Sequence, residues 1–160
     1  MSIFELTNQP KQFIMKKLFI SGNAINTDFG LLIIRLIIGV LMAFYGYEKY
    51  THFNEMAASD FWMKNVSFLG LSSKIALGLT IFAELVCSVL LILGLFSRFS
   101  LFFLMFCMGY IFLVVFPMSI INKGQNGTEF NPAFVYFTIY LGLFFTGVGK
   151  YSLDAKLFRK

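Results

Sequence analysis

The segment from Lys74 to Phe99, "KIALGLTIFAELVCSVLLILGLFSRF", decides the fold class of this chain. It is uncharged from Ile75 to Phe96 except for one carboxylate, Glu84. About 20 such residues in a helix cross a hydrocarbon core roughly 30 Å thick. A carboxylate inside that core costs about 2.5 kcal/mol or more, so Glu84 needs a compensating partner.

The whole composition is that of an integral membrane protein. The 160 residues are 58% hydrophobic and 13% charged, with a mean hydropathy of +0.78. We predict an all-α fold, an antiparallel four-helix bundle, because no segment alternates in polarity as a barrel strand does. The predicted domains are an interfacial N-terminal segment (1–28), a transmembrane domain (29–150) and a basic tail (151–160), with spans at about 29–50, 75–96, 99–118 and 132–149.

Charge predicts the orientation, because short cytoplasmic flanks of membrane helices are enriched in Lys and Arg. Both termini and the short connection at Ser97 and Arg98 lie on the more basic side, so both termini are expected in the cytoplasm. The net charge of +5 then suits anionic lipid rather than nucleic acid. The N-terminal "PKQFIMKKLFI" could form an amphipathic helix in the interface, and "NKGQNGTEFN" is expected to be a simple turn region.

The loop after the first span carries aromatic side chains. We interpret Tyr45, Tyr47, Tyr50 and Trp62 as anchors at the membrane surface. The polar segment that follows, "NEMAASDFWMKNVSFLGLSS", is expected to fold back onto the outer surface. If a protein partner binds there, its docking surface would be an apolar patch around Phe61, Trp62 and Phe68.

Helical spacing places the polar residues of the second span on one stripe. Thr80, Glu84, Cys87 and Ser88 share a face, which is expected to point inward because lipid cannot satisfy polar groups. In the first span Arg35 shares a face with the small residues at 39, 43 and 46. We estimate a height difference of roughly 5 to 8 Å between Arg35 and Glu84 and predict that they pair. The alternative is that Arg35 extends to the headgroups and Glu84 is protonated.

The short connection near Ser97 adds two further predictions. Cys87 and Cys107 are each ten residues from it, and Glu84 and Tyr110 are each thirteen residues from it, so each pair could be neighbours. Tyr110 is a candidate donor to Glu84. The two thiols could act in redox chemistry, but without a Cys-x-x-Cys pair we favour buried, inert thiols.

The candidate sites follow from these patterns. A polar cluster of Arg35, Glu84 and Tyr110 is the candidate catalytic site. The candidate cofactor-binding residues are Glu84, Cys87, Tyr110 and Thr138. With His52 as the single histidine, we expect neither a metal site nor a haem held by two histidines. Thr138, Gly142 and Thr146 are interpreted as a helix-packing face.

Three motifs together resemble the DoxX family of small bacterial four-helix membrane proteins. They are "RLIIGVLMAFYGYEKY", "FAELVCSVLLILGLFSRFS" and "GVGKYSLDA". The positions that match the family are, in chain order, Arg35, Gly39, Gly46, Lys49, Glu84, Gly94, Arg98, Gly149, Ser152, Leu153 and Asp154. The resemblance implies a multi-pass protein of the bacterial inner membrane that works in the lipid bilayer with protein partners.

Two functions follow from the resemblance. In the first, the chain is an accessory subunit of a membrane complex linked to quinone reduction, with Arg35, Glu84 and Tyr110 binding the quinone head and delivering protons. In the second, it is a non-catalytic assembly factor or structural subunit for other membrane or exported proteins. We expect an accessory subunit rather than a chain that catalyses alone, with no intrinsic cofactor, and a homo-oligomer is compatible with either function.

Overall fold

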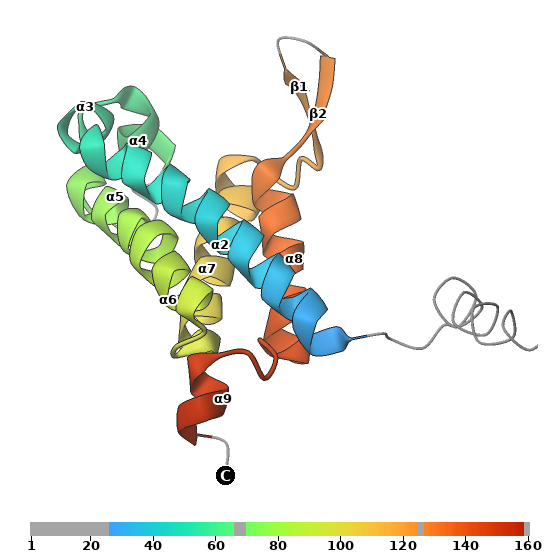
Figure 1. Cartoon of the computed structure of the whole chain (residues 1–160). Coiled ribbons are helices and arrows are strands. Elements are labelled where there is room, and N and C mark those ends of the chain that lie inside the picture. The colour runs from blue at the N-terminus through green and yellow to red at the C-terminus, as the bar shows by residue number, and fades with distance from the viewer. Residues whose placement is uncertain (1–25, 66–69, 125–126, 159–160) are drawn as a thin grey trace, which may run out of the picture.

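The computed structural model describes residues 26–65, 70–124 and 127–158 (Figure 1). The predicted amphipathic helix of the N-terminal segment and Phe68 of the predicted docking patch lie outside these ranges. Within them the chain is mostly helical. Three helical stretches are long and apolar enough to cross a membrane: Thr27–Thr51, Ser73–Leu93 and Ser97–Val115.

The first stretch is the single helix α2 (Thr27–Thr51). The second joins α5 (Ser73–Ile81), the π-helix η2 (Phe82–Cys87) and α6 (Ser88–Leu93). The third joins α7 (Ser97–Tyr110) and the π-helix η3 (Ile111–Val115). A π-helix accommodates an extra residue per turn and is frequent at functional sites. Two of the three long helical stretches therefore contain such an irregularity.

The fourth predicted span is shorter than expected. Helix α8 (Pro132–Thr146) has 15 residues, about 22 Å at 1.5 Å per residue. It begins at Asn131, whose side chain accepts a hydrogen bond from the amide of Ala133 at 3.0 Å, and Pro132 suits the first turn. It ends because Gly147 adopts φ +80°, so residues 147–149 turn away from the helix axis.

Glycines bring α2 close to the second helical stretch. A Cβ on Gly39 would stand 2.6 Å from a side-chain atom of Ile92, and a Cβ on Gly46 would stand 2.6 Å from the backbone nitrogen of Leu85. The predicted close-packing face of α2 is therefore confirmed at these two positions. Beyond this contact, α7 packs against α8, with Leu104, Met108, Tyr140 and Leu143 in the shared core.

The connections differ from the predictions in two places. The turn between the second and third helices is at Gly94–Phe96, not at Ser97 and Arg98, and α7 already begins at Ser97. The Gly- and Asn-rich loop is not a simple turn but a β-hairpin of β1 (Ile121–Gly124) and β2 (Gly127–Phe130). These strands are antiparallel, with Ile121 opposite Phe130, so the fold is not purely α-helical.

The segment after α2 folds back, as predicted. Two short helices, α3 (Phe53–Ala57) and α4 (Asp60–Asn65), pack against α5. Trp62 is only 7% exposed in a small core with Ala57, Leu77 and Ile81, so it packs inside the protein, whereas Tyr47 and Tyr50 are exposed.

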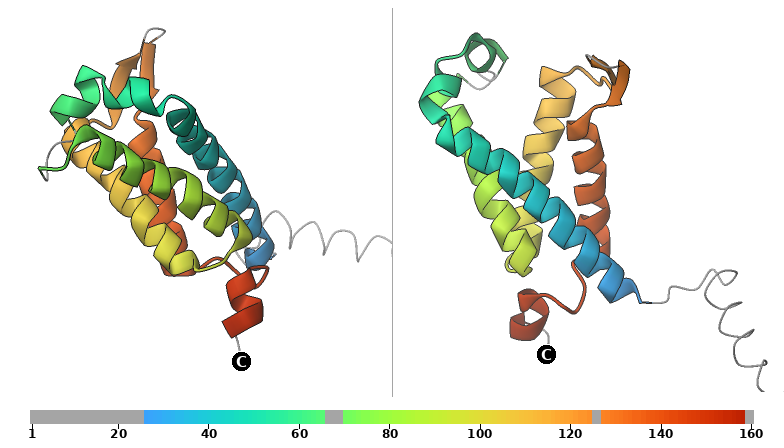
Figure 2. Two further views of the ribbon diagram at one scale, coloured as in Figure 1. Left: turned by 90° about the vertical axis from the view of Figure 1, so that its left-hand side faces the viewer. Right: turned by 45° about the horizontal axis from the view of Figure 1, so that its top comes forward.

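The two ends of the molecule are built from different elements. The β-hairpin, α3 and α4 lie at one end, and the start of α2 lies at the other, together with the final helix α9 (Leu153–Phe158) (Figures 1 and 2). The first and last described residues are therefore at the same end.

Candidate functional site

Glu84 is buried in η2 and is paired with Lys49 of α2. The carboxylate side chain is 2% exposed, and the Nζ of Lys49 donates a hydrogen bond to its Oε2. The ring of Tyr45 lies 5.7 Å from the same Nζ, within the range of a cation–π contact. The inward orientation predicted for Glu84 is confirmed, but its partner is Lys49.

The predicted pairing of Arg35 with Glu84 is wrong, and the glycine contacts explain why. Gly39 lies against Ser88 and Ile92, and Gly46 lies against Glu84 and Leu85. This register places Arg35 eleven residues along α2 from the level of Glu84, which is roughly 16 Å at 1.5 Å per residue. Lys49, by contrast, follows Gly46 by three residues, so its side chain starts within reach of the carboxylate.

A cavity of about 580 Å³ opens beside this ion pair. We call it the Lys49 pocket. It lies between α5 and η2 on one side and α7 and η3 on the other, and α4 contributes two aromatic side chains. Its lining residues are Lys49, Phe61, Trp62, Leu71, Ala76, Leu79, Thr80, Phe82, Ala83, Phe103, Phe106, Cys107, Tyr110, Ile111 and Val115.

The wall of the Lys49 pocket is mainly apolar and aromatic. The rings of Phe82 and Phe103 meet edge to face at 5.7 Å between centroids and join the two sides. The polar groups of the wall belong to Lys49, Thr80, Cys107, Tyr110 and the indole of Trp62. An apolar cavity with a few polar groups is the usual form of a small-molecule site. Both π-helices contribute to it, η2 through Phe82 and Ala83 and η3 through Ile111 and Val115.

The structure divides the predicted site residues among several places. Tyr110 lines the Lys49 pocket, as does Cys107. Cys87 instead lies fully buried in the main core, and both cysteines are free thiols. Thr138 is exposed on α8, where its hydroxyl donates to the backbone oxygen of Val135 at 2.8 Å, so it does not belong to the pocket. The donation from Tyr110 to Glu84 stays a prediction.

The guanidinium of Arg35 binds the backbone of the C-terminal segment. Its two terminal nitrogens donate to the backbone oxygens of Val148 and Tyr151, each at 3.0 Å, and the residue is 2% exposed. The C-terminal segment therefore supplies acceptors for both terminal nitrogens of the buried guanidinium, while its Nε has no hydrogen-bond partner among the described residues.

Asp154 joins the same segment to the start of α7. Its carboxylate accepts hydrogen bonds from the amides of Phe96 and Ser97, each at 2.8 Å, and its own amide donates to the oxygen of Gly94 at 2.9 Å. It thus caps a helix whose first amides lack intrahelical partners. Burial raises the pKa of Asp154, but these hydrogen bonds and the charge of Arg35 outweigh it and hold the pKa below its ordinary value.

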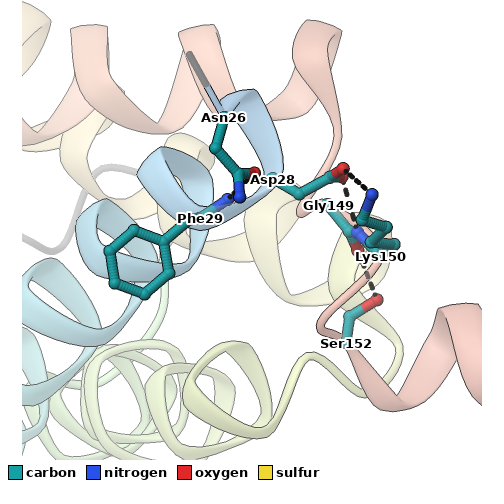
Figure 3. Close-up of polar contacts among 6 residues, drawn as sticks. All are labelled: Asn26, Asp28, Phe29, Gly149, Lys150 and Ser152. Carbon is teal, nitrogen blue, oxygen red and sulfur yellow. Dashed lines mark hydrogen bonds and ion pairs between the residues drawn. The ribbon is translucent and has the colours of Figure 1, made fainter. Parts of the chain in front are cut away.

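A third contact ties the segment to the start of α2. The carboxylate of Asp28 accepts a hydrogen bond from the backbone amide of Lys150 at 2.9 Å and pairs with the Nζ of Lys150 at 3.0 Å (Figure 3). Gly149, at φ +77°, passes close to Asp28: a Cβ there would stand 3.2 Å from the backbone oxygen of Asp28. We call the contacts of residues 148–154 with Asp28, Arg35 and the α6–α7 turn the C-terminal clasp.

Lys49 is the site residue that the sequence interpretation missed. In the sequence, Lys49 is identified only as a match to the family pattern. Its position three residues after Gly46 and seven after Met42, on the buried face of α2, was the available signal.

Comparison with known proteins agrees with this architecture. The family model named DoxX matches residues 30–117, more than half of the chain. An uncharacterized protein of Haemophilus influenzae is 39% identical over 83 residues, which cover 48% of this chain and 58% of that protein. No solved structure matches the chain. The chain is a multi-pass membrane protein, and it belongs to the DoxX family.

Proposed function

We propose that the chain is an accessory subunit of a quinone-linked redox complex in the bacterial cytoplasmic membrane and that the Lys49 pocket binds the quinone head. The observation that carries this proposal is the cavity itself, which adjoins a buried ion pair in the helical domain. Its volume of about 580 Å³ is within the usual range of about 300 to 1,000 Å³ for small-molecule sites.

The pocket residues suit this role. Lys49 and Tyr110 carry N–H and O–H donors for a quinone carbonyl, and Thr80 adds a hydroxyl group. Glu84, bonded to Lys49, is the acid that could exchange a proton with the bound head. The aromatic rings at 82, 103 and 106 would contact the quinone ring and tail. Electrons would come from a partner subunit.

The proposed topology is an antiparallel four-helix bundle with both termini in the cytoplasm. Two observations support it. The start of α2 and helix α9 lie at one end of the molecule (Figure 1). Basic residues belong to the elements that meet there: Arg98 to the start of α7, which Asp154 contacts, Lys150 to the pair with Asp28 of α2, and Lys156 to α9. Basic flanks of this kind favour the cytoplasmic side.

The test is quinone reduction in native membranes of a strain that depends on this protein. We expect Glu84→Gln to lower quinone-dependent electron transfer at least tenfold at unchanged protein level, since proton exchange beside the quinone head is lost. Glu48→Gln is the matched control, because Glu48 is an exposed carboxylate of α2 that directly precedes Lys49 in the sequence. Undiminished transfer with Glu84→Gln would contradict the proposed proton role.

A second candidate function is that of an assembly factor or structural subunit. The C-terminal clasp favours it, because Arg35, Gly94 and Asp154 match the family pattern yet build a structural contact away from the Lys49 pocket. In that case, mass spectrometry of protein extracted in mild detergent would find stoichiometric protein partners without redox centres and without retained quinone. A redox partner with retained quinone would support the first function.

A further inference from the structure

The charges around the Lys49 pocket limit what it can bind. Among the described lining residues, Lys49 is the charged one, and its ammonium is neutralised by the carboxylate of Glu84 directly behind it. The other polar groups of the wall are a hydroxyl, a thiol, a phenol and an indole N–H, all of them neutral. The wall therefore has no net charge while the ion pair is intact.

An anionic head would enter this cavity at a cost. It would lie near the Glu84 carboxylate, and the one positive charge of the lining is already balanced. In an apolar cavity an uncompensated charge is unfavourable. A cationic head would in turn compete with Lys49 for Glu84. A neutral head avoids both penalties.

The ammonium of Lys49 still favours one kind of neutral head. An ammonium has three donors, and Glu84 accepts from one of them, while the side chain, 18% exposed, also contributes to the pocket wall. A carbonyl oxygen that reached it would receive a charge-assisted hydrogen bond, about twice as strong as a neutral one. The apolar walls would hold an aliphatic or aromatic body.

We propose that Lys49 and Glu84 select ligands by charge: Lys49 binds the carbonyl of a neutral lipophilic ligand, and Glu84 excludes anionic amphiphiles such as fatty acids. This inference rests on the proposed ligand role of the pocket and deepens it. It predicts that removal of the carboxylate charge reverses the preference, because Lys49 then carries an unbalanced positive charge.

Trp62 provides the assay, because it is the single tryptophan of the chain and lines the pocket. Bromine quenches tryptophan fluorescence on contact. Dibromododecanoate and its methyl ester form a matched pair of probes: both carry a carbonyl and the same tail, and at about pH 8 only the acid is charged. Purified full-length protein in a neutral detergent is titrated with each probe. The variant Thr80→Phe, whose larger side chain fills the pocket, is the background control: its quenching comes only from probe dissolved in the detergent micelle.

For the unmodified protein we expect saturable quenching by the ester and an affinity for the acid at least tenfold lower. Glu84→Gln should raise the affinity for the acid about tenfold or more and reverse the order. Lys49→Met should weaken ester binding about tenfold, as expected for loss of a hydrogen bond to a charged group. Lys64→Met, which removes an exposed lysine of α4, is the control and should change neither affinity.

Three results would overturn the charge selection, and they differ in what else they overturn. Equal affinities of the unmodified protein for ester and acid would refute it while leaving the pocket as a ligand site, and the same holds if the order persists in Glu84→Gln. If both probes quench the unmodified protein and Thr80→Phe identically, neither enters the pocket, and the charge selection and the proposed quinone site are refuted together. Equal affinities of the unmodified protein for the two probes would refute the charge selection without any variant, so this arm of the test does not depend on a variant folding.

Discussion

At the scale of single residues, the buried charged residues Glu84 and Arg35 have separate roles. Glu84 is neutralised by Lys49 beside the pocket, whereas the two terminal nitrogens of Arg35 donate to the backbone oxygens of Val148 and Tyr151. Each charge thus has partners inside the protein, which is what its burial requires. The Lys49–Glu84 pair belongs to the candidate site, and the hydrogen bonds of Arg35 hold the C-terminal segment in place.

Removal of Lys49 leaves a buried carboxylate without its cation. We predict that Lys49→Met lowers the free energy of unfolding by about 3 kcal/mol, the usual loss when one partner of a buried pair is removed. The double variant Lys49→Met with Glu84→Gln should recover much of this loss. Lys64→Met, which breaks an exposed pair with Asp60, should cost less than about 1 kcal/mol.

These values can be compared by denaturant titration of the purified protein in one detergent. If Lys49→Met and Lys64→Met were equally mild, the buried ion pair would not contribute to stability in the way described.

The lowered pKa of Asp154 predicts that the protein loses stability in acid. Its pKa is below the ordinary value of about 3.9 in the folded protein, so the unfolded chain binds the proton more tightly. The stabilisation is therefore complete above about pH 5 and is lost as the pH falls through the lowered pKa. Melting temperatures measured across this range should fall more steeply for the unmodified protein than for Asp154→Asn. Parallel curves would show that the clasp does not depend on this charge.

At the scale of elements, close contact between α2 and η2 determines which residues meet. Gly46 allows the backbones to touch at Glu84 and Leu85, and η2 turns Glu84 into the protein. The small-residue pattern of the sequence predicted this contact face but not its register. The pairing of Lys49 with Glu84 is a consequence of that register, which depends on packing between distant parts of the chain.

The close contact between Gly46 and η2 can be tested by substitution, with Gly78 as an internal control. We predict that Gly46→Ala destabilises the protein by about 1 to 3 kcal/mol, because its Cβ would stand 2.6 Å from a backbone nitrogen, which cannot move as a side chain can. Gly78→Ala, where a Cβ has no neighbour within 4 Å, should be neutral or stabilising by up to about 1 kcal/mol. Thermal unfolding of both variants in the same detergent compares them. Equal stability would mean that α2 is not held this close to η2.

Local signals explain which parts of the structure were predictable. Apolar length indicated the helices from Thr27 to Val115, and helical spacing indicated the inward face of Glu84. No local pattern indicated that Arg35 binds a segment 113 residues away, nor that Asp154 caps α7. Lys49 was missed because lysines near the end of a membrane helix commonly extend to the headgroups.

At the scale of the whole molecule, the arrangement of the ends supports a membrane orientation. The β-hairpin lies at the end opposite to α9 and to the start of α2 (Figure 2). The C-terminal clasp connects the start of α2, the α6–α7 turn and the last residues, so one end of the molecule is fastened by polar contacts. The Lys49 pocket is set apart from this fastened end.

The orientation can be tested by cysteine labelling in intact cells. In a chain whose Cys87 and Cys107 are replaced by Ala, we expect Thr128→Cys, on the exposed face of the β-hairpin, to react with a membrane-impermeant maleimide. Lys156→Cys, on α9, should react only after the cells are opened. The reverse pattern would place both described ends outside the cytoplasm.

The central claim is that the Lys49 pocket holds a lipophilic ligand. Native mass spectrometry of the protein extracted from its own membrane tests it most directly, with Thr80→Phe as the filled-pocket control. We expect the unmodified protein to retain a neutral lipophilic molecule at close to one per chain, and the proposed function predicts that this molecule is a quinone. Thr80→Phe should lose it. Identical spectra with only dispersed lipid in both proteins would contradict the claim and make the Lys49–Glu84 pair a structural contact.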